Sequence, residues 1–451
     1  MSKSSSGNGQ GSFVDDRPDE QYFSVHSDAF HDERLLELEF DHVFSKTWAF
    51  LGVASQIPKA HDYITTYIGR TPILVTRAAD DQVRAFLNIC RHKGSILARM
   101  SSGNRRVHVC PYHSWSYDST GKNILVKDKE KGAYPESFER QDHDLLAIAK
   151  IASYKGLIFG SLSADVPDLE TYLGETRHII DLAMDQGPDG MEIIPGYIAY
   201  TYAGNWKLQL DNGHDQYHLT STHPSLMAVV NNRKAKGKGN LQAKQFDWNK
   251  RIHQTGGMFT FAHGHIVSWL NQAEPENRPA YRYIDEIANR LGKEKAEWVL
   301  KMRNLTVFPN MQIADSTSLL IRTFRPLAPD LTEMRVWCLA PIGEPAETRE
   351  WRIRQFEDFF NVSGMATPDD TTVYELLQQA FRSGQPGWLQ GYRRGETVFV
   401  DGASESARTL GMSPVSSLEE SFTVQNEVVL HTPHRELQRL IKRGLSHLPP
   451  Y

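Results

Sequence analysis

Two short segments of the chain combine cysteine and histidine in a pattern that can bind iron. Cys90 and His92 are separated by one residue, Cys110 and His113 by two, and residues 93–109 lie between the pairs. Two thiolates can hold one iron of a [2Fe–2S] cluster while two neutral imidazoles hold the other, which is the Rieske arrangement. Because imidazoles replace two negatively charged thiolates, such a cluster has a raised reduction potential and suits a one-electron relay.

A structural zinc site is the alternative interpretation of these four residues, because cysteine and histidine also form closed tetrahedral zinc sites. Zinc sites usually pair two cysteines or two histidines within each half of the motif. Here each half carries one cysteine and one histidine. The spacing therefore favours the cluster.

A second group of polar residues lies at 211–223. His214 and His218 are four residues apart with Asp215 after the first, similar to the H-E-x-x-H pattern of zinc hydrolases. His218 and His223, with a carboxylate from elsewhere, would instead form a 2-His-1-carboxylate iron(II) site. Residues five apart lie about 140° around a regular helix, so this pairing needs a distorted or broken helix. Spacing alone slightly favours zinc, but a one-electron relay has no purpose beside a redox-inert metal.

The composition is that of an ordinary globular protein. The 451 residues are 40% hydrophobic and 23% charged, with a net charge of −5, so nothing favours a nucleic acid or an anionic membrane as partner. Two of the three cysteines belong to the cluster motif, which argues against a disulfide framework. No window has the length of a transmembrane helix. We expect a cytoplasmic protein.

The pattern of apolar residues predicts four regions and an α+β fold. We expect a disordered N-terminus at 1–20, a helix at 21–49 that packs on the catalytic domain, a small all-β Rieske domain at 50–165, and a catalytic domain at 166–451. The Rieske domain is thus inserted in a catalytic domain with an antiparallel sheet flanked by helices. Further helices are predicted at 167–186, 346–361, 370–382 and 432–443, strands at 305–308, 318–324 and 334–340, and a surface loop at 231–240.

Over nearly its whole length the chain resembles the large catalytic (α) subunit of Rieske non-haem iron ring-hydroxylating dioxygenases. The resemblance rests on the cluster motif, on 205–207 and 211–223, and on the segment Gly-Met-Ala-Thr-Pro-Asp-Asp at 364–370. The nearest pattern is that of the benzoate, anthranilate and 2-halobenzoate branch, whose middle motif usually reads E-N-G-x-D-G-Y-H. This chain departs from it with Asp211 for the glutamate and Gln216 for the glycine.

The resemblance implies that His218, His223 and Asp370 bind the mononuclear iron, with Asp369 as the less favoured substitute for Asp370. Without the resemblance, these two aspartates after Pro368 look equally like the first turn of a helix, where acidic residues are favourable.

The resemblance also implies how electrons reach the iron. Asp215 would bridge from His218 to the cluster ligand His113 of a neighbouring subunit, in a trimeric ring that brings each cluster beside the next subunit's iron. Asn212 would line the approach to the iron.

The implied function is that of a terminal oxygenase that uses O2 to dihydroxylate an aromatic ring. The expected substrate is an aromatic carboxylic acid such as anthranilate, benzoate or 2-halobenzoate, and the product a cis-diol or catechol. No Rossmann glycine motif follows a strand, so NAD(P)H would act only through a separate flavin reductase, with or without a ferredoxin. The branch also implies a small β subunit in an α3β3 assembly. The alternative is a Rieske monooxygenase acting on salicylate-like, indolic or amine-bearing rings.

Five further residues have two interpretations each. Arg322 and Arg325, on or beside a predicted strand, could bind a substrate carboxylate or form ordinary salt bridges. His253, His263 and His265 could line the substrate pocket or pack in the core.

Overall fold

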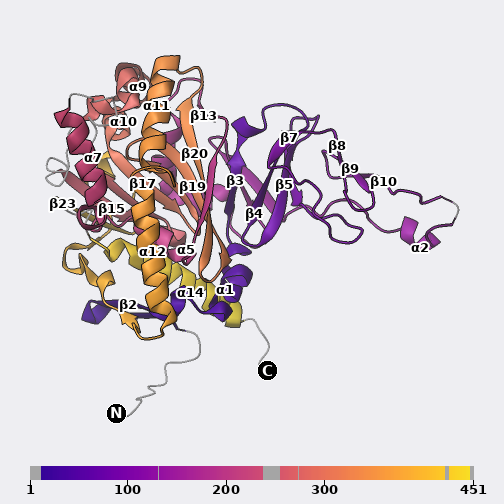
Figure 1. The fold of residues 1–451 in the computed structure, drawn as a ribbon, viewed down its shortest axis with the longest axis horizontal. Helices are drawn as coiled ribbons and strands as arrows, with labels where there is room; N and C mark the ends of the chain where they lie inside the picture. Colours follow the sequence, from indigo (N-terminus) through magenta and orange to yellow (C-terminus); the bar gives the residue numbers. More distant parts are fainter. Residues whose placement is uncertain (1–11, 131, 237–253, 273, 422–425, 447–451) are drawn as a thin grey trace, which may run out of the picture. The chain divides into compact units, whose positions relative to one another are not determined.

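The computed structural model describes residues 12–130, 132–236, 254–272, 274–421 and 426–446 (Figure 1). The chain forms two compact units, one of residues Phe44–Thr171 and one of Met1–Val43 with Tyr172–Tyr451. The predicted α+β class is confirmed, because one unit is built almost entirely of strands and the other joins a large antiparallel sheet to helices.

The smaller unit contains three small antiparallel sheets. Its strands are β3 (Ala49–Val53), β4 (Asp62–Ile68), β5 (Thr71–Arg77), β6 (Val83–Leu87), β7 (Ser102–Asn104), β8 (Val107–Val109), β9 (Ser116–Asp118), β10 (Asn123–Leu125), β11 (Lys150–Tyr154) and β12 (Leu157–Ser161), in the orders β6-β5-β4-β7, β10-β9-β8 and β11-β12-β3. Side chains of a strand alternate between faces. On β5, Ile73 and Val75 therefore enter one apolar cluster, whereas Leu74 enters another that contains Cys90 and Cys110.

The larger unit is organised around a ten-stranded antiparallel sheet. Its strands are β13 (Met191–Ile193), β14 (Ile198–Tyr202), β15 (Thr255–Thr260), β16 (Ile266–Leu270), β17 (Met302–Val307), β18 (Met311–Asp315), β19 (Leu319–Ala328), β20 (Leu331–Pro341), β22 (Val400–Asp401) and β23 (Ser416–Ser421), in the order β13-β20-β19-β18-β17-β16-β15-β23-β22, with β14 also paired to β20. The three strands predicted within 305–340 correspond to β17, β19 and β20.

Helices cover this sheet, and two of them (orange in Figure 1) cross it in front. The helices are α1 (Glu33–Glu39), α3 (Leu169–Leu173, in the smaller unit except for its end), α4 (Arg177–Met184), α5 (Trp206–Asn212), α6 (Leu219–Thr222), α7 (Pro224–Ala235), α9 (Ile284–Leu291), α10 (Lys293–Leu300), α11 (Ala346–Phe359), α12 (Thr367–Arg382), α13 (Glu405–Thr409) and α14 (His431–Ser446). Proline lies near the start of α12, where its missing N–H costs nothing. Contacts of α12 with β14 and α6 bring residues far apart in the sequence together.

The N-terminal region differs from the expectation. Instead of disorder up to residue 20, Val14–Arg17 forms β1, which pairs with β2 (Tyr22–His26). The expected helix at 21–49 is reduced to α1, followed by a π-helix at Phe40–Phe44 and the start of β3. The apolar run at 49–53 is a fully buried strand, and a short apolar run of this kind has no period that separates strand from helix.

Two other predicted segments also change. The helix expected at 167–186 is broken at Gly174, which has φ +50° and separates α3 from α4. The surface loop expected at 231–240 is in part the end of α7, and its residues 237–240 lie outside the described residues, as does His253.

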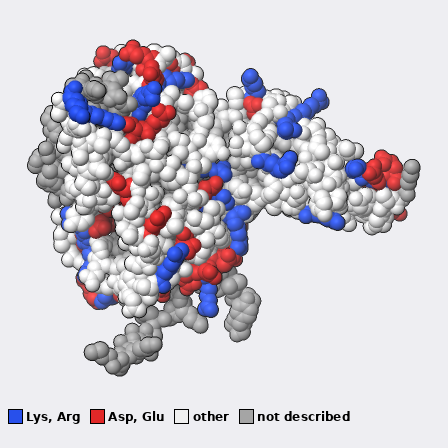
Figure 2. All heavy atoms as spheres, in the orientation of Figure 1, with Lys and Arg blue, Asp and Glu red and all other residues white. Residues whose placement is uncertain are grey.

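The surface and the helices agree with the composition. On the face shown in Figure 2, most of the surface is neither basic nor acidic, and acidic side chains gather at one end of the smaller unit. None of the helices within the described ranges combines the length and the apolar character that crossing a membrane requires.

Candidate metal centres

The first candidate centre is formed by two loops with the same backbone hydrogen bonds. In one loop the N–H of Cys90 donates to the carbonyl of Ser95 at 2.8 Å, and the N–H of Gly94 to that of Cys90 at 3.0 Å. In the other, Cys110 N–H donates to the carbonyl of Trp115 at 2.9 Å and that of Ser114 to Cys110 at 3.0 Å. The fifth residue of each loop has a positive φ, +75° at Gly94 and +61° at Ser114. Each loop thereby presents one cysteine and one histidine.

The four side chains of these loops fit a [2Fe–2S] cluster. The thiols of Cys90 and Cys110 are free and buried, and the His92 and His113 rings lie 4.4 Å apart by their centroids. The Nδ1 atoms of both histidines are buried and, within the described ranges, have no hydrogen-bond partner. Buried polar atoms without a partner are rare and call for an explanation, and two irons ligated by two thiolates and two imidazoles provide one.

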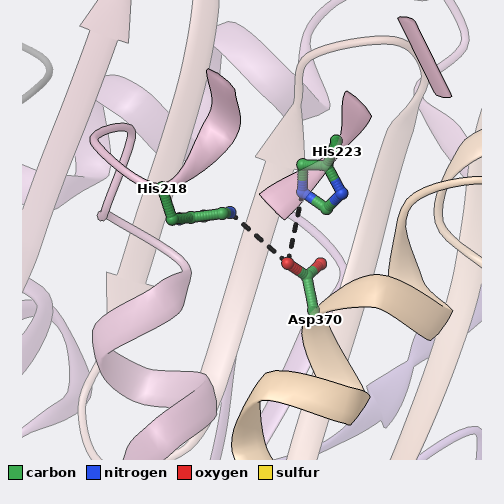
Figure 3. A group of neighbouring side chains, drawn as sticks. All are labelled: His218, His223 and Asp370. Atoms are coloured by element: carbon green, nitrogen blue, oxygen red, sulfur yellow. Dashed lines mark ion pairs between the residues drawn. The ribbon is translucent and has the colours of Figure 1, made fainter. Parts of the chain in front are cut away.

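The second candidate centre is a group of two histidines and one aspartate (Figure 3). His218 and His223 flank the short helix α6, so the i, i+5 pair stands at the two ends of a broken helix, as that spacing required. Asp370 lies in the first turn of α12. Its Oδ1 is 3.4 Å from Nε2 of His218 and 3.3 Å from Nε2 of His223. One ligand atom from each residue lies within 4.8 Å of the others.

The electrostatics of this group favour a bound cation. Burial lowers the pKa of His218, but its contacts with Asp215 and Asp370 outweigh burial and raise the pKa to about 10. Burial raises the pKa of Asp370, but the two imidazoles overcome it and hold the pKa at about 2. A positive charge is therefore stabilised between the three side chains, and a divalent metal would supply it while leaving the imidazoles neutral.

Each histidine of the group is also held by a second carboxylate. Asp215 Oδ2 lies 3.0 Å from Nδ1 of His218, and Asp369 Oδ2 lies 3.2 Å from Nδ1 of His223. Carboxylates in this position fix the tautomer and orientation of metal-binding imidazoles. Asp369 therefore faces the back of His223 rather than the point where the three ligand atoms converge.

Asp211 and Asn212, two residues of the segment 211–223, contact side chains from other parts of the catalytic unit. The amide Nδ2 of Asn212 lies 3.4 Å from Nε2 of His218 and 3.3 Å from Oδ1 of Asp370, so it borders the candidate metal position. Asp211 accepts from the Tyr392 hydroxyl at 2.7 Å and contacts His434 Nε2 at 3.0 Å.

A cavity of about 250 Å³ adjoins two of the three candidate ligands, His218 and Asp370, and is lined in part by α12. Its lining is apolar over most of the α12 face and acidic at Asp211, Asp215 and Glu427. Burial, together with the charges of Asp215 and Asp211, raises the pKa of Glu427 to about 7. The cavity is therefore unfavourable to anions.

Two of the remaining candidate histidines, His214 and His265, are structural, and His263 is half-buried beside the ring of Tyr172. His214 is buried and contacts Ser268 Oγ at 3.2 Å and Thr306 Oγ1 at 2.7 Å through its two ring nitrogens, and burial lowers its pKa to about 3. It is absent from the metal-binding group, so the zinc alternative with His218 loses one of its ligands. His265 is likewise buried and bonded to backbone groups.

Sequence reasoning missed the anchor of α5. Lys207 Nζ lies 2.5 Å from Oε1 of Glu39, and Trp206 Nε1 donates to Oε2 of the same carboxylate at 2.6 Å. Both charged side chains are buried, so the end of α1 and the start of α5 are joined by an ion pair. Glu39 stands between Glu37 and Asp41 in the sequence, so nothing there distinguished it from an ordinary surface acid.

Comparison with known proteins agrees with the geometry of both centres. Residues 47–150 match the Rieske [2Fe–2S] domain family, and residues 193–442 match the ring hydroxylating alpha subunit (catalytic domain) family. The chain is 38% identical over 441 residues to toluate 1,2-dioxygenase subunit alpha of Pseudomonas putida, covering 95% of this chain and 96% of that protein. It is 37% identical to the large subunit of 2-halobenzoate 1,2-dioxygenase of Burkholderia cepacia, covering 95% and 91%.

A solved structure gives the same result. Naphthalene 1,2-dioxygenase from Rhodococcus sp. bound to indole superposes with a TM-score of 0.80 at 25% identity, covering 94% of this chain and 95% of that one. The enzyme therefore uses a Rieske [2Fe–2S] cluster and mononuclear iron, with O2 as co-substrate. The expected family is confirmed, and the chain belongs to the α subunits of the Rieske non-haem iron aromatic-ring-hydroxylating dioxygenases.

Proposed function

We propose that this α subunit dihydroxylates the ring of an aromatic carboxylic acid. Two of its relatives are named for toluate and 2-halobenzoate, both of which are carboxylated arenes, and each match covers more than nine-tenths of both chains. Addition of both atoms of O2, two electrons and two protons to adjacent ring carbons gives a cis-diol. If one of these carbons carries a halide, loss of halide and of the carboxylate as CO2 leads to a catechol.

We infer that His218, His223 and Asp370 hold the iron. The observation that carries this assignment is that both Nε2 atoms face Asp370 Oδ1 while both Nδ1 atoms face carboxylates of their own. Such an arrangement orients each imidazole toward a metal and away from competing tautomers. Iron(II) held by two histidines and one carboxylate would supply the reduction of O2. The Asn212 amide contacts both His218 and Asp370 and would lie beside the metal.

The cluster ligands in this proposal are Cys90, His92, Cys110 and His113. Their two loops share one backbone geometry, and the four candidate ligand atoms are buried. The zinc alternative would also explain buried thiols, but the match to the Rieske domain family favours the cluster.

We propose further that Asp215 links the two kinds of centre across subunits. Its Oδ2 already contacts His218, and the side chain borders the cavity on the α12 side, where it is 23% exposed. The same carboxylate can accept from His113 of the partner subunit, which gives a short route for electrons. This arrangement requires a trimer of α subunits, and we expect a small β subunit to complete an α3β3 assembly. A flavin reductase, with or without a ferredoxin, would deliver electrons from NAD(P)H.

Single-turnover product analysis tests the proposed function without the reductase. The iron-loaded enzyme is reduced chemically, mixed with O2, and supplied with benzoate, 2-aminobenzoate, a 2-halobenzoate, salicylate or toluene. We expect a cis-diol from benzoate and a catechol from the 2-substituted acids. Oxidation of the cluster with no product from any acid would reject the substrate class, and a product with a single added oxygen would identify a monooxygenase instead.

A further inference from the structure

We propose that Arg322 binds the carboxylate of the substrate and so selects aromatic acids over uncharged rings. This inference rests on the proposed function, because it names the residue that would recognise the charged group of that substrate class. Arg322 lies on β19, an interior strand of the ten-stranded sheet.

The register of the sheet places Arg322 on the face against which the segment before His218 packs. Arg322 is paired with Gln312 on β18, which is paired with Thr306 on β17. Side chains of directly paired residues lie on one face of a sheet. Thr306 on this row contacts His214, and Gln312 lies against Gly213, where an added Cβ atom would clash with the Gln312 amide. The row therefore packs against the segment that runs from α5 to His218.

The guanidinium of Arg322 is positioned by neutral groups. Its Nε donates to Oε1 of Gln312 at 2.7 Å, and its centre lies 5.7 Å from the ring centroid of Phe360. Among the residues that the structure describes, no carboxylate pairs with it. Arg325 is different, because its guanidinium lies 2.7 Å from a carboxylate oxygen of Glu333. Of the two arginines singled out in the sequence, Arg325 forms an ordinary salt bridge. The terminal nitrogens of the Arg322 guanidinium are available to bind the carboxylate of a substrate.

The surroundings of Arg322 suit an aromatic ring. Phe360 packs against two apolar clusters. Leu219, the residue after His218, packs against one of them, and Tyr200 on β14 packs against the other. These three side chains and Arg322 itself are only half-buried, so each keeps some accessible surface in the described part of the chain. Apolar and aromatic walls with one charged group are typical of sites for small aromatic acids.

Arg322 and the iron site also act on one common side chain. Burial raises the pKa of Tyr200 to about 12, and the charges of Arg322 and Asp370 act on it in opposite directions. The Tyr200 phenol therefore lies within electrostatic reach of both groups. A substrate with its carboxylate at the arginine would extend its ring toward the iron ligands.

The acidic cavity cannot serve this purpose. The cavity beside α12 is lined by Asp211, Asp215 and Glu427, and its described lining contains neither lysine nor arginine. A carboxylate would be repelled there, since like charges at short range are unfavourable. We therefore expect the substrate carboxylate to point toward Arg322 on the sheet. The acidic cavity would serve electron transfer instead.

The test compares Arg322→Gln with wild type and with Arg325→Gln as a matched control from the same strand. Each holoenzyme is assayed for KM and kcat with benzoate, for product yield in a single turnover at saturating benzoate, and for iron content and the visible spectrum of the cluster. We expect Arg322→Gln to lower kcat/KM roughly 10- to 100-fold, mainly through KM, because it removes a charge-assisted bidentate contact. Arg325→Gln should leave KM for benzoate unchanged.

The outcomes separate the inference from the function on which it rests. Wild type that converts no aromatic acid would overturn both. Conversion of benzoate by wild type with an unchanged KM in iron-loaded Arg322→Gln would overturn the inference alone. If Arg322→Gln loses iron, Arg322→Lys decides, because lysine keeps the charge without the planar fork. A raised KM with retained iron and cluster supports carboxylate binding, and an unchanged KM overturns it.

Discussion

Replacement of Asp215 by asparagine tests whether this carboxylate conducts electrons or only orients a ligand. Asp215 Oδ1 accepts from the backbone N–H of Tyr217 at 2.6 Å, and its Oδ2 lies 3.0 Å from His218 Nδ1. Asparagine keeps an oxygen for the backbone contact, so the loop geometry should survive. It removes the negative charge opposite Nδ1. Loss of such a partner costs about 10- to 100-fold in metal affinity or activity.

The chain provides a matched control for this variant. Oδ2 of Asp369 lies 3.2 Å from Nδ1 of His223, just as Oδ2 of Asp215 lies 3.0 Å from Nδ1 of His218. The exposed fractions are also similar, 29% for the Asp369 side chain and 23% for that of Asp215. Asp369→Asn should therefore lose about the same 10- to 100-fold through ligand orientation. Of these two aspartates, Asp215 lines the acidic cavity through which we expect electrons to arrive, and Asp369 does not. Any loss in Asp215→Asn beyond that in Asp369→Asn measures the electron route.

Stopped-flow absorption of the reduced cluster is the appropriate assay. Chemically reduced, iron-loaded enzyme is mixed with O2 and benzoate, and the rate of cluster reoxidation is followed together with product yield. We expect Asp215→Asn to retain both metals and the cluster spectrum while reoxidation slows far more than in Asp369→Asn. Equal losses in the two variants would reduce Asp215 to an orienting residue, and reoxidation at the wild-type rate would refute both roles.

Three further predictions follow from the geometry. Asp370→Asn should lose mononuclear iron but keep the visible cluster spectrum, because only its carboxylate faces both ligand imidazoles, and loss of the spectrum as well would indicate misfolding. Glu39→Gln should destabilise the catalytic unit by about 3–5 kcal/mol in urea unfolding, since Lys207 is left buried without its counter-charge; the double variant Glu39→Leu with Lys207→Met should recover much of this loss. His265 has a pKa lowered from 6.5 to about 3 by burial, so the unfolded chain binds the extra proton and stability is lost as pH falls below 6.5, by about 2 kcal/mol between pH 7 and pH 5. A wild-type pH slope in His265→Gln would contradict that assignment.

The cluster loops could be predicted from sequence because their chemistry is local. All four candidate ligands lie within two short turns, and the spacing of each pair already limits what one loop can present to a metal. Gly94, with φ +75°, is the one residue of the first loop whose type shows its backbone conformation in advance.

The proposed iron ligands could be predicted from the sequence only in part. His218 and His223 are close in sequence, and their spacing correctly required an interrupted helix. Asp370 is 147 positions beyond His223 (370 − 223), and nothing in its neighbourhood distinguishes a ligand from an ordinary acidic residue at a helix start. Its place depends on contacts of α12 with α6 and β14, which are long-range and leave no periodic signal.

The same limit explains the errors near the N-terminus. The apolar residues at 30–50 satisfy a helical period, but those from Ala49 onward belong to β3, whose position is set by pairing with β12 more than a hundred residues later. Glu39 gave no sign of its ion pair with Lys207, because a buried charge is recognised only once its partner is known.

The first turn of α12 shows that two interpretations of one motif can hold together. Asp369 and Asp370 are adjacent, so their side chains leave the helix about 100° apart. Asp369 therefore reaches Nδ1 of His223, whereas Asp370 reaches the Nε2 atoms of both His218 and His223. The N-terminal turn of a helix also favours negative charge. The helix start that made these residues look ordinary is thus what allows two neighbouring carboxylates to contact the same histidine from opposite sides.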